Sequence, residues 1–339
     1  MVKVREITDK NEWEAFVLDR PEANFLHSWN WGEFYRNLGQ EMKRWGWEKD
    51  SRLVGVGSAI IERAKRASYV VVPGGPLLDW SDKEMVNRFG ETIKKFAKEN
   101  KCSFVRVRPQ ILETPENANL FSQLGFGKAP MHLHAELTHQ LDLAGSEEEL
   151  LAWMRKATRY EVKQAIKLGI KIDASQNAEE ISEFYDLQMQ TARRQGFVPF
   201  SRKFLQEQFR VFAGDNQCVL YTAWLGKMKL AQAMVMFYGR EADYHYGASS
   251  EGGRKYPGAY LIQWEAIKEA KKRGMARYNL WGVAPEGERS HRFYGVSVFK
   301  RGFGGQDVAY LHARDLVLDW PGYAVNWGIE MVRKWMRKV

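Results

Sequence analysis

Two short stretches of the chain, LGFGKA (124–129) and RGFGGQ (301–306), share a Gly-Phe-Gly core. Three other pairs of similar segments precede them in the same order, beginning at Leu53 and Leu230, at Tyr69 and Asp243, and at Lys95 and Glu269. The first residues of the four pairs lie 174 or 177 positions apart. Because a nearly constant offset over four ordered segments rarely arises by chance, it predicts a duplicated domain.

Each half of the chain reads as two strands, a helix, a strand, the Gly-Phe turn and one further strand. Mixed elements in this order predict an α/β, or α+β, fold in which mixed sheets are flanked by helices. We place the domain boundary before Ser146, which forms a capping box with Glu149 at a helix start. The predicted domains are residues 1–145 and 146–319, and a terminal helix over residues 320–339 joins the first domain.

The composition fits a globular chain of two domains. Of its 339 residues, 45% are hydrophobic and 27% charged, and this length supports two cores. No apolar run approaches the roughly 18 residues of a membrane-spanning helix, and the start MVKVREITDKNEWEAF does not read as a signal peptide. Cys102 and Cys218 lack metal-binding spacing and suggest no disulfide framework, so we expect a cytoplasmic protein.

The net charge of +9 favours a polyanionic partner such as nucleic acid, a nucleotide-linked substrate or an anionic membrane face. The strongest local feature is MRKATRYEVKQAIKLG (154–169), where four cations recur every four residues: Arg155, Arg159, Lys163 and Lys167. This spacing puts them on one drifting face of a helix, which either lies along a phosphate backbone or is simply solvated. The terminal helix carries Trp and Met on one side and Arg and Lys on another, so peripheral membrane contact also stays open.

Two other stretches are candidates for ligand contact. HSWNWGEFYRNLG (27–39) is either an amphipathic helix with aromatic core residues or a cleft with Arg36 at its mouth. DYHYGASSEGGRKYPGAYLIQWEA (243–266) is a strand, a glycine-rich turn and a helix, a form that can cradle phosphate. Pro257 stands where a coenzyme A loop has its first glycine and donates no amide hydrogen, which argues against that ligand.

Chemistry-bearing motifs are otherwise sparse. His132 and His134 alternate in MHLHAEL, but the sequence identifies no further ligands. There is no nucleophile elbow, Walker loop or paired cysteine motif. We therefore expect no metal and no cofactor, and any substrate of an enzyme of this kind would arrive already activated.

Five stretches together resemble the FemX/FemAB family of non-ribosomal peptidyltransferases: SWNWGEF, RKATRYEVKQAIKLGI, DYHYGASSEG, LIQWEAIKEAKKRGMARYNLWGV and YGVSVFKRGFGG. They span nearly the whole chain in the family's order, and no room remains for a long coiled-coil insertion, as in the shorter FemX type. The resemblance implies two tandem acetyltransferase-like (GNAT-like) domains. It also implies transfer of an amino acid from aminoacyl-tRNA to the peptide stem of a peptidoglycan precursor, either UDP-MurNAc-pentapeptide or lipid II.

The resemblance also implies roles for individual residues. Phe299 and Lys300 map onto the catalytic channel of the second domain, and Tyr246 falls beside them. Phe204 and its neighbour Arg202 match positions near the substrates. Arg301 joins the four cations of residues 155–167 as a predicted tRNA contact.

The first domain is implied to bind the precursor through Trp31, Glu33 and Arg36. Glu33 departs from the short FemX type, which can carry a phosphate-binding lysine there. Arg108, in VRVRP, stands where an acidic residue can occur, so a protein carboxylate base loses support.

Three other functions compete with this interpretation. One is tRNA-dependent aminoacyl transfer to a protein N-terminus or a lipid. Another is a non-catalytic RNA-binding protein, and the third is a coenzyme A-dependent acetyltransferase. The transferred amino acid, the choice between soluble and lipid-linked acceptor, and the oligomeric state are left open by the sequence.

Overall fold

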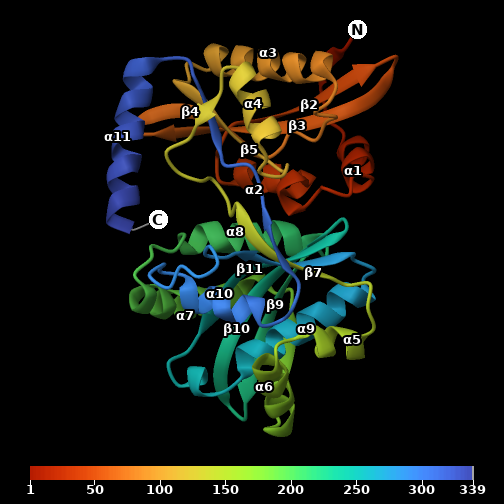
Figure 1. The fold of residues 1–339 in the computed structure, drawn as a ribbon, viewed down its shortest axis with the longest axis vertical. Helices are drawn as coiled ribbons and strands as arrows, with labels where there is room; N and C mark the ends of the chain where they lie inside the picture. Colours follow the sequence, from red (N-terminus) through yellow and green to blue (C-terminus); the bar gives the residue numbers. More distant parts are fainter. Residues whose placement is uncertain (338–339) are drawn as a thin grey trace. The chain divides into compact units, whose positions relative to one another are not determined.

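The computed structural model describes residues 1–337, and the last two residues of the predicted terminal helix, 338–339, lie outside the described residues. The chain divides into two compact units, one made of residues 1–136 and the segment from Ala309 onward, the other of residues 137–308. Each unit contains one seven-stranded mixed sheet with helices on it (Figure 1). The expected fold class, mixed sheets flanked by helices in two units, is confirmed.

The first unit contains β1 (Lys3–Glu6), α1 (Lys10–Leu18), the 3-10 helix η1 (Phe25–His27), α2 (Trp29–Asn37), β2 (Met42–Lys49), β3 (Arg52–Ala64), β4 (Ala67–Gly74), α3 (Lys83–Glu99), β5 (Phe104–Pro109), α4 (Pro115–Gln123), β6 (Gly127–Lys128), β14 (Arg314–Val317) and α11 (Trp320–Arg337). The helices α3 and α4 cover one face of its sheet, and α1 and α2 the other (Figure 1).

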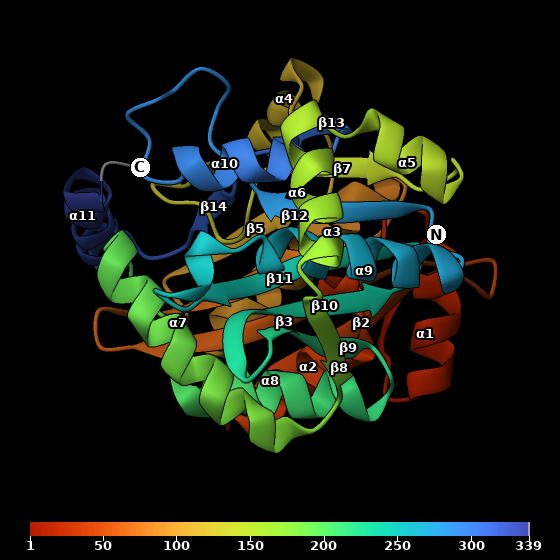
Figure 2. The same ribbon diagram turned by 90° about the horizontal axis from the view of Figure 1, so that it is seen from below.

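The second unit contains β7 (Leu137–Asp142), α5 (Glu147–Trp153), α6 (Lys156–Lys167), β8 (Lys171–Ser175), η2 (Ala178–Glu180), α7 (Ile181–Gln195), α8 (Arg202–Gly214), β9 (Cys218–Leu225), β10 (Met228–Tyr238), β11 (Glu241–Ser249), η3 (Gly253–Lys255), α9 (Gly258–Lys272), β12 (Arg277–Gly282), α10 (Tyr294–Arg301) and β13 (Gln306–Ala309). Figure 2 shows α9 on one face of its sheet and α7 and α8 on the other. The predicted capping box of Ser146 and Glu149 begins α5.

The two sheets have the same strand order, as the predicted duplication requires. The first runs β1-β2-β3-β4-β5-β14-β6 and the second, read from its β8 edge, β8-β9-β10-β11-β12-β7-β13. The two central pairs β4/β5 and β11/β12 are parallel. The shared Gly-Phe-Gly cores have one structural role in common, because Phe126 and Phe303 are both buried in the core of their own unit.

The sixth strand of each sheet comes from the other half of the sequence. β7 follows the first half of the chain but pairs with β12, and β14 follows the second half but pairs with β5. The sequence placed the boundaries at 145/146 and 319/320, whereas the units divide at 136/137 and 308/309. The difference arises because the further strand of each half adds its hydrogen bonds to the sheet of the other half.

A buried ion cluster fixes β14 and α11 in the first unit. Arg106 of β5 donates hydrogen bonds of 2.8 and 2.7 Å to Asp315, its partner across the strands, and of 3.0 and 2.9 Å to Glu330 of α11. Burial alone would lower the pKa of Arg106, but the bonds and charges of the two carboxylates outweigh it and raise that pKa. The Tyr323 hydroxyl donates to Asp315 at 3.1 Å and completes the cluster.

The two places where the chain passes between units are also held by polar contacts. Next to the first, His312 Nδ1 lies 2.7 Å from a carboxylate oxygen of Glu136, and next to the second, His139 Nδ1 lies 2.7 Å from one of Asp307. Burial would raise the pKa of each carboxyl group, but it is outweighed by the hydrogen bond of His312 to Glu136 and by those of Arg301 and His139 to Asp307. Both pKa values therefore lie below the ordinary range. Ionised carboxylates are therefore part of the connection between the halves.

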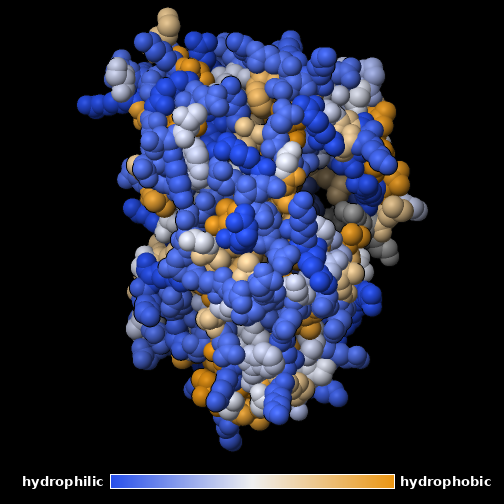
Figure 3. Space-filling view, turned by 180° about the vertical axis from the view of Figure 1, so that it is seen from behind, coloured by the Kyte–Doolittle hydropathy of each residue, from blue (hydrophilic) through white to orange (hydrophobic). Residues whose placement is uncertain are grey.

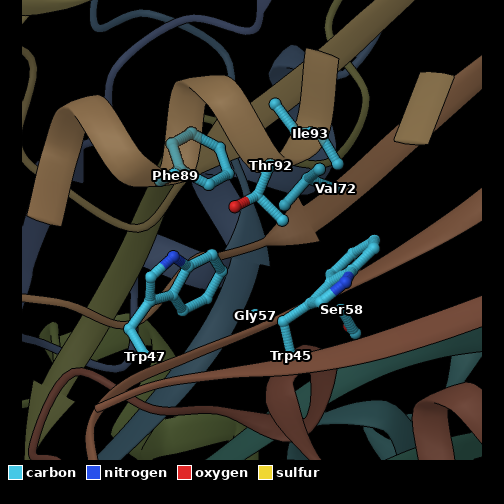
Figure 4. Close-up of a pocket in the computed structure, with 8 residues that line it drawn as sticks. All are labelled: Trp45, Trp47, Gly57, Ser58, Val72, Phe89, Thr92 and Ile93. Carbon is cyan, nitrogen blue, oxygen red and sulfur yellow. The ribbon is translucent and has the colours of Figure 1, made fainter. Parts of the chain in front are cut away.

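Two tryptophans of β2 belong to the core of the first unit. Trp45 and Trp47 rise from the sheet toward Phe89 and Ile93 of α3 (Figure 4). Gly57 lies next to Trp47, and a Cβ atom there would come within 3.1 Å of that ring. The space these side chains line belongs to the core of the unit, since nearly all of them are buried and apolar.

We expect the Arg106→Met variant to lose about 3–5 kcal/mol of unfolding free energy, because Asp315 would lose its buried cation and Glu330 would keep only Arg66, at 3.6 Å. Denaturant titration measures the loss. Arg63→Met is the matched control, since Arg63 pairs with Glu41 on the surface and should contribute less than about 1 kcal/mol. Equal losses in the two variants would contradict a structural role for the cluster.

Candidate active site

The parallel strands at the centre of the two sheets differ in how far they stay together. β4 and β5 pair over six residues, from Tyr69 opposite Phe104 onward. β11 and β12 pair over three, ending at Asp243 opposite Asn279. β11 and β12 both continue past that point without pairing with each other, so the second sheet opens between them. The first sheet has no such opening between β4 and β5.

Backbone irregularities accompany this opening. The β10/β11 register shifts so that His245 is an extra residue on β11. The β12/β7 register shifts after Asn279, and Trp281 has φ +65, a left-handed conformation that an aromatic residue rarely adopts. The Asn279 side chain accepts a 2.8 Å hydrogen bond from the Trp281 amide and supports this conformation. Backbone strain of this kind tends to collect at functional sites.

Lys300 lies at the end of β12. It comes from the last turn of α10 and is only 7% exposed. Its Nζ donates a 2.7 Å hydrogen bond to the Gly282 carbonyl oxygen and lies 5.6 Å from the centre of the Tyr244 ring. In the described part of the chain, no carboxylate forms an ion pair with it. Burial lowers the pKa of Lys300 to about 7, so the amine changes charge near neutral pH.

Aromatic side chains form a connected row along β11 and α8. Phe204 stacks on Phe200 with ring centres 4.3 Å apart, and Phe200 meets Tyr246 edge-on at 6.0 Å. His245 lies 4.0 Å from Tyr246 and 5.7 Å from Trp281. The sequence therefore predicted two members, Tyr246 and Phe204, that the structure brings into one cluster.

His245 lies next to Tyr246 in β11. Burial lowers its pKa to about 3, so the imidazole stays neutral. Its Nε2 accepts a 3.2 Å hydrogen bond from the side-chain amide of Gln208 on α8. His245, Gln208 and Trp281 were not predicted from the sequence. The bulge at His245 and the left-handed conformation of Trp281 leave no periodic signal. His245 and Trp281 lie within the motif stretches, whereas Gln208 lies outside them.

Two other predicted residues of the second unit have mainly structural contacts. Phe299 packs edge-on against Tyr260 at 4.8 Å and Phe303 at 5.3 Å, as part of the core. Arg202 is exposed and pairs with Asp186 at 2.9 Å. None of these contacts involves Lys300 or Tyr246, so the predicted roles of Phe299 and Arg202 stay predictions.

The predicted precursor-binding helix α2 is fixed by a buried arginine that the sequence analysis did not single out. Arg44 of β2 stacks on Trp29 at 3.5 Å and pairs with Glu33 at 3.0 Å. Burial lowers the pKa of Arg44 to about 10 despite the nearby carboxylate. Gly32 permits this approach, because a Cβ there would lie 2.3 Å from the Arg44 guanidinium.

The remaining members of this predicted set divide between core and surface. Trp31 is buried against Phe25, Phe34, Tyr35 and His134. Arg36 is 54% exposed and pairs with Glu33 at 3.2 Å. Only Arg36 thus presents a cation to solvent, and Glu33 is its neighbour and the counter-ion of Arg44.

Arg108 is fully buried at the end of β5. Its guanidinium donates to the side-chain oxygen of Gln110 and, at 2.5 Å, to the carbonyl of Ala135, and it lies 5.0 Å from the centre of the Tyr310 ring. Ala135 and Tyr310 directly flank the two passages of the chain between units. These contacts give Arg108 a structural role, and its predicted role toward substrate stays a prediction.

Two of the four cations predicted to contact tRNA also donate hydrogen bonds to backbone carbonyls, and the tRNA-binding role of all four stays a prediction. Arg159 donates to the Ala152 carbonyl at 2.9 Å and Arg155 to the Val298 carbonyl at 3.3 Å. Lys163 and Lys167 are exposed on α6, and within residues 1–337 no carboxylate pairs with them.

Arg301 also has partners within the second unit. It pairs with Asp307 at 2.5 Å and donates to the Ala284 carbonyl at 2.6 Å, which fastens α10 to β13. Residues 131–134, which carry His132 and His134, are not a strand. No group of three potential metal ligands occurs among the described residues.

Comparisons with known proteins agree over almost the whole chain. The FemAB family profile matches residues 8–124, 124–226 and 225–311. The lipid II:glycine glycyltransferase of Staphylococcus haemolyticus is 23% identical, over 96% of this chain and 95% of its own length. That of Staphylococcus aureus strain USA300 is 22% identical with the same coverage.

Solved structures agree on the fold. The crystal structure of FemX superposes with a TM-score of 0.85 at 19% identity, covering 95% of this chain and 99% of FemX. A tandem GNAT protein from the clavulanic acid biosynthesis pathway has a TM-score of 0.60 at 11% identity, with 93% and 98% covered. The two units are therefore tandem GNAT-like domains, and the chain belongs to the FemAB family.

Proposed function

We propose that this chain is an aminoacyltransferase that moves an amino acid from aminoacyl-tRNA onto the peptide stem of lipid II. The observation that carries the proposal is the match to lipid II:glycine glycyltransferases over 96% of this chain and 95% of theirs. An interpeptide bridge or branch would be the product. The reaction would take place in the cytoplasm, where charged tRNA is found.

The chemistry needs no nucleophile from the protein. The acceptor amine attacks the ester carbonyl carbon of the donor, a C–N bond forms, and the C–O bond to the tRNA ribose breaks. The amine loses a proton and the ribose oxygen gains one. Negative charge builds up on the carbonyl oxygen and then on the leaving oxygen, so a fixed cation lowers the barrier.

Lys300 suits this role better than any other cation of the second unit. It is buried, held by one carbonyl and paired with no carboxylate among residues 1–337, so its charge is available to an anion. One donor aimed at a developing oxyanion contributes about 3–4 kcal/mol. A terminal phosphate of the tRNA is the other anion it would hold. Alignment of the two substrates supplies much of the remaining acceleration.

Mass spectrometry tests the proposed reaction directly. Lipid II and, separately, UDP-MurNAc-pentapeptide are incubated with the protein and a mixture of charged tRNAs. We expect lipid II to gain the mass of an amino acid at the side-chain amine of the stem, and the added mass identifies the residue. Phosphatidylglycerol and a peptide with a free N-terminus serve as competing acceptors. If phosphatidylglycerol or the peptide is modified and neither lipid II nor UDP-MurNAc-pentapeptide is, the proposal is contradicted.

Substitution of Lys300 tests the cation. We expect Lys300→Met to reduce kcat/KM by about 10²–10³-fold and to leave the melting temperature equal or higher, since a buried amine with a lowered pKa costs stability. Lys300 is charged below pH 7 and neutral above it. Activity that needs the ammonium therefore falls as pH rises through about 7. The Lys300→Arg variant stays charged, so we expect it to keep part of the activity and to lose this fall of kcat/KM with pH.

The opposite pH dependence would give Lys300 another role. If kcat/KM rises through pH 7 because of this group and Lys300→Arg is inactive, the neutral amine accepts a proton, and the cation hypothesis is wrong. A melting temperature that falls sharply in Lys300→Met would indicate a structural residue.

Salt dependence tests the predicted tRNA contact on α6. We expect tRNA binding to weaken steeply with salt, and the Lys163→Gln/Lys167→Gln variant to reduce the slope of log K against log salt by about 2. Lys94→Gln/Lys98→Gln on α3 is the control, because these lysines are exposed with the same spacing. Equal slopes for both double variants would remove α6 from the tRNA site.

A further inference from the structure

The terminal helix α11 packs with its polar side inward. Its buried residues are Tyr323, Asn326 and Glu330, which recur at helical spacing on one face. Glu330 pairs with Arg106, and Asn326 accepts a hydrogen bond from Arg66. The only carboxylate among the described residues of α11 is thereby buried and neutralised by arginine.

Most of the solvent-exposed surface of α11 is apolar. Eight large hydrophobic residues are exposed: Trp320, Val325, Trp327, Ile329, Met331, Val332, Trp335 and Met336. Trp335 is 81% exposed and Trp320 70%. In Figure 3, hydrophobic residues lie along the right-hand edge, on the side of α11. A contiguous apolar face of this kind marks an interaction surface.

The charges at the border of this face are positive. Arg333 is exposed and Lys334 half-buried, and neither forms an ion pair in the part of the chain that the structure describes. Lys65, next to Arg66 in the β3–β4 turn, is exposed as well. This combination of an apolar face and basic flanks complements a surface that is anionic outside and apolar beneath.

The aromatic residues distinguish a bilayer from a second protein chain. Three tryptophans occur near the start, middle and end of the 18-residue helix, and tryptophan is the residue that prefers the membrane–water interface. The helix contains no leucine, the usual residue of a helix–helix seam. Within residues 1–337 no helix is long and apolar enough to cross a bilayer, so α11 would lie along the surface.

We propose that α11 docks this protein on an anionic lipid bilayer, with its apolar face in the interfacial layer and Arg333 and Lys334 at the headgroups. At about 1.5 Å per residue, the helix would lie along about 27 Å of membrane surface. The docking does not depend on the transfer reaction. It would, however, bring the enzyme to the surface that holds a lipid-linked acceptor.

Vesicle co-sedimentation of the full-length protein tests this docking. The probes are vesicles of phosphatidylcholine with phosphatidylglycerol, and of phosphatidylcholine alone, without lipid II. We expect the wild-type protein to bind the anionic vesicles. The Val332→Gln/Trp335→Gln variant should bind them about tenfold or more weakly with an unchanged melting temperature, since both side chains are exposed.

Two controls separate α11 from other surfaces. Val198→Gln/Ile166→Gln removes two exposed apolar residues elsewhere and should bind like wild type. Lys163→Gln/Lys167→Gln reduces the positive charge of α6 and should retain most of the vesicle binding. If it abolishes binding, or if the α11 variant binds like wild type, the proposal is wrong.

The oligomeric state is measured on the same proteins by analytical ultracentrifugation. A wild-type dimer that becomes a monomer in Val332→Gln/Trp335→Gln, with no change in vesicle binding, would assign the face to a second copy and overturn the proposal. Loss of vesicle binding without loss of transfer to a soluble precursor would support docking independently of the reaction.

Discussion

The exchange of the sixth strands is the constraint on which the rest of the structure depends. In each sheet the strand at the Gly-Phe turn, β6 or β13, lies at one edge. The strand next to it, β14 or β7, comes from the other half of the sequence. Neither half of the chain can therefore complete its own sheet. The buried cluster of Arg106, Asp315 and Glu330 gives this exchange its specificity, because the cation on β5 is satisfied only when β14 and α11 are both in place.

Sequence periodicity predicted the elements well and their partners poorly. The repeat offset located the strands and helices of both halves, because alternation and caps are local features. The partner of Leu137–Asp142 is not a local property, so the strand was assigned to the first domain although it pairs with β12. VRVRP likewise reads as an alternating strand, but nothing local indicates that Arg106 and Arg108 are both buried beside distant carboxylates and carbonyls.

The same limit applies to the candidate site. The resemblance located Lys300 and Tyr246, and the structure adds the opened strands, the bulge at His245 and the left-handed Trp281 that surround them. Motif matching does not separate residues that face a ligand from those that hold the motif in shape. Glu33 and Phe299 were chosen because they lie within matching stretches, and both have structural partners. The apolar side of α11 points outward for a related reason, since Arg106 of β5 and Arg66 of the β3–β4 turn bind its polar side.

Comparison of the two halves explains why only one would carry the chemistry. At the repeat offset of 174 residues Gly282 corresponds to Arg108, and at 177 Lys300 corresponds to Gln123. At the corresponding place in the first unit, the buried cation Arg108 belongs to the strand itself, and a glutamine oxygen and a carbonyl accept its hydrogen bonds. In the second unit the cation comes from α10 instead, and the described residues offer it one carbonyl. Burial lowers the pKa of an ammonium group that has so few partners. An anion that arrives with a substrate would therefore stabilise its charged form strongly. Under the proposed function, the duplication would thus have produced one unit in which Arg108 serves the structure and one in which Lys300 serves the substrate.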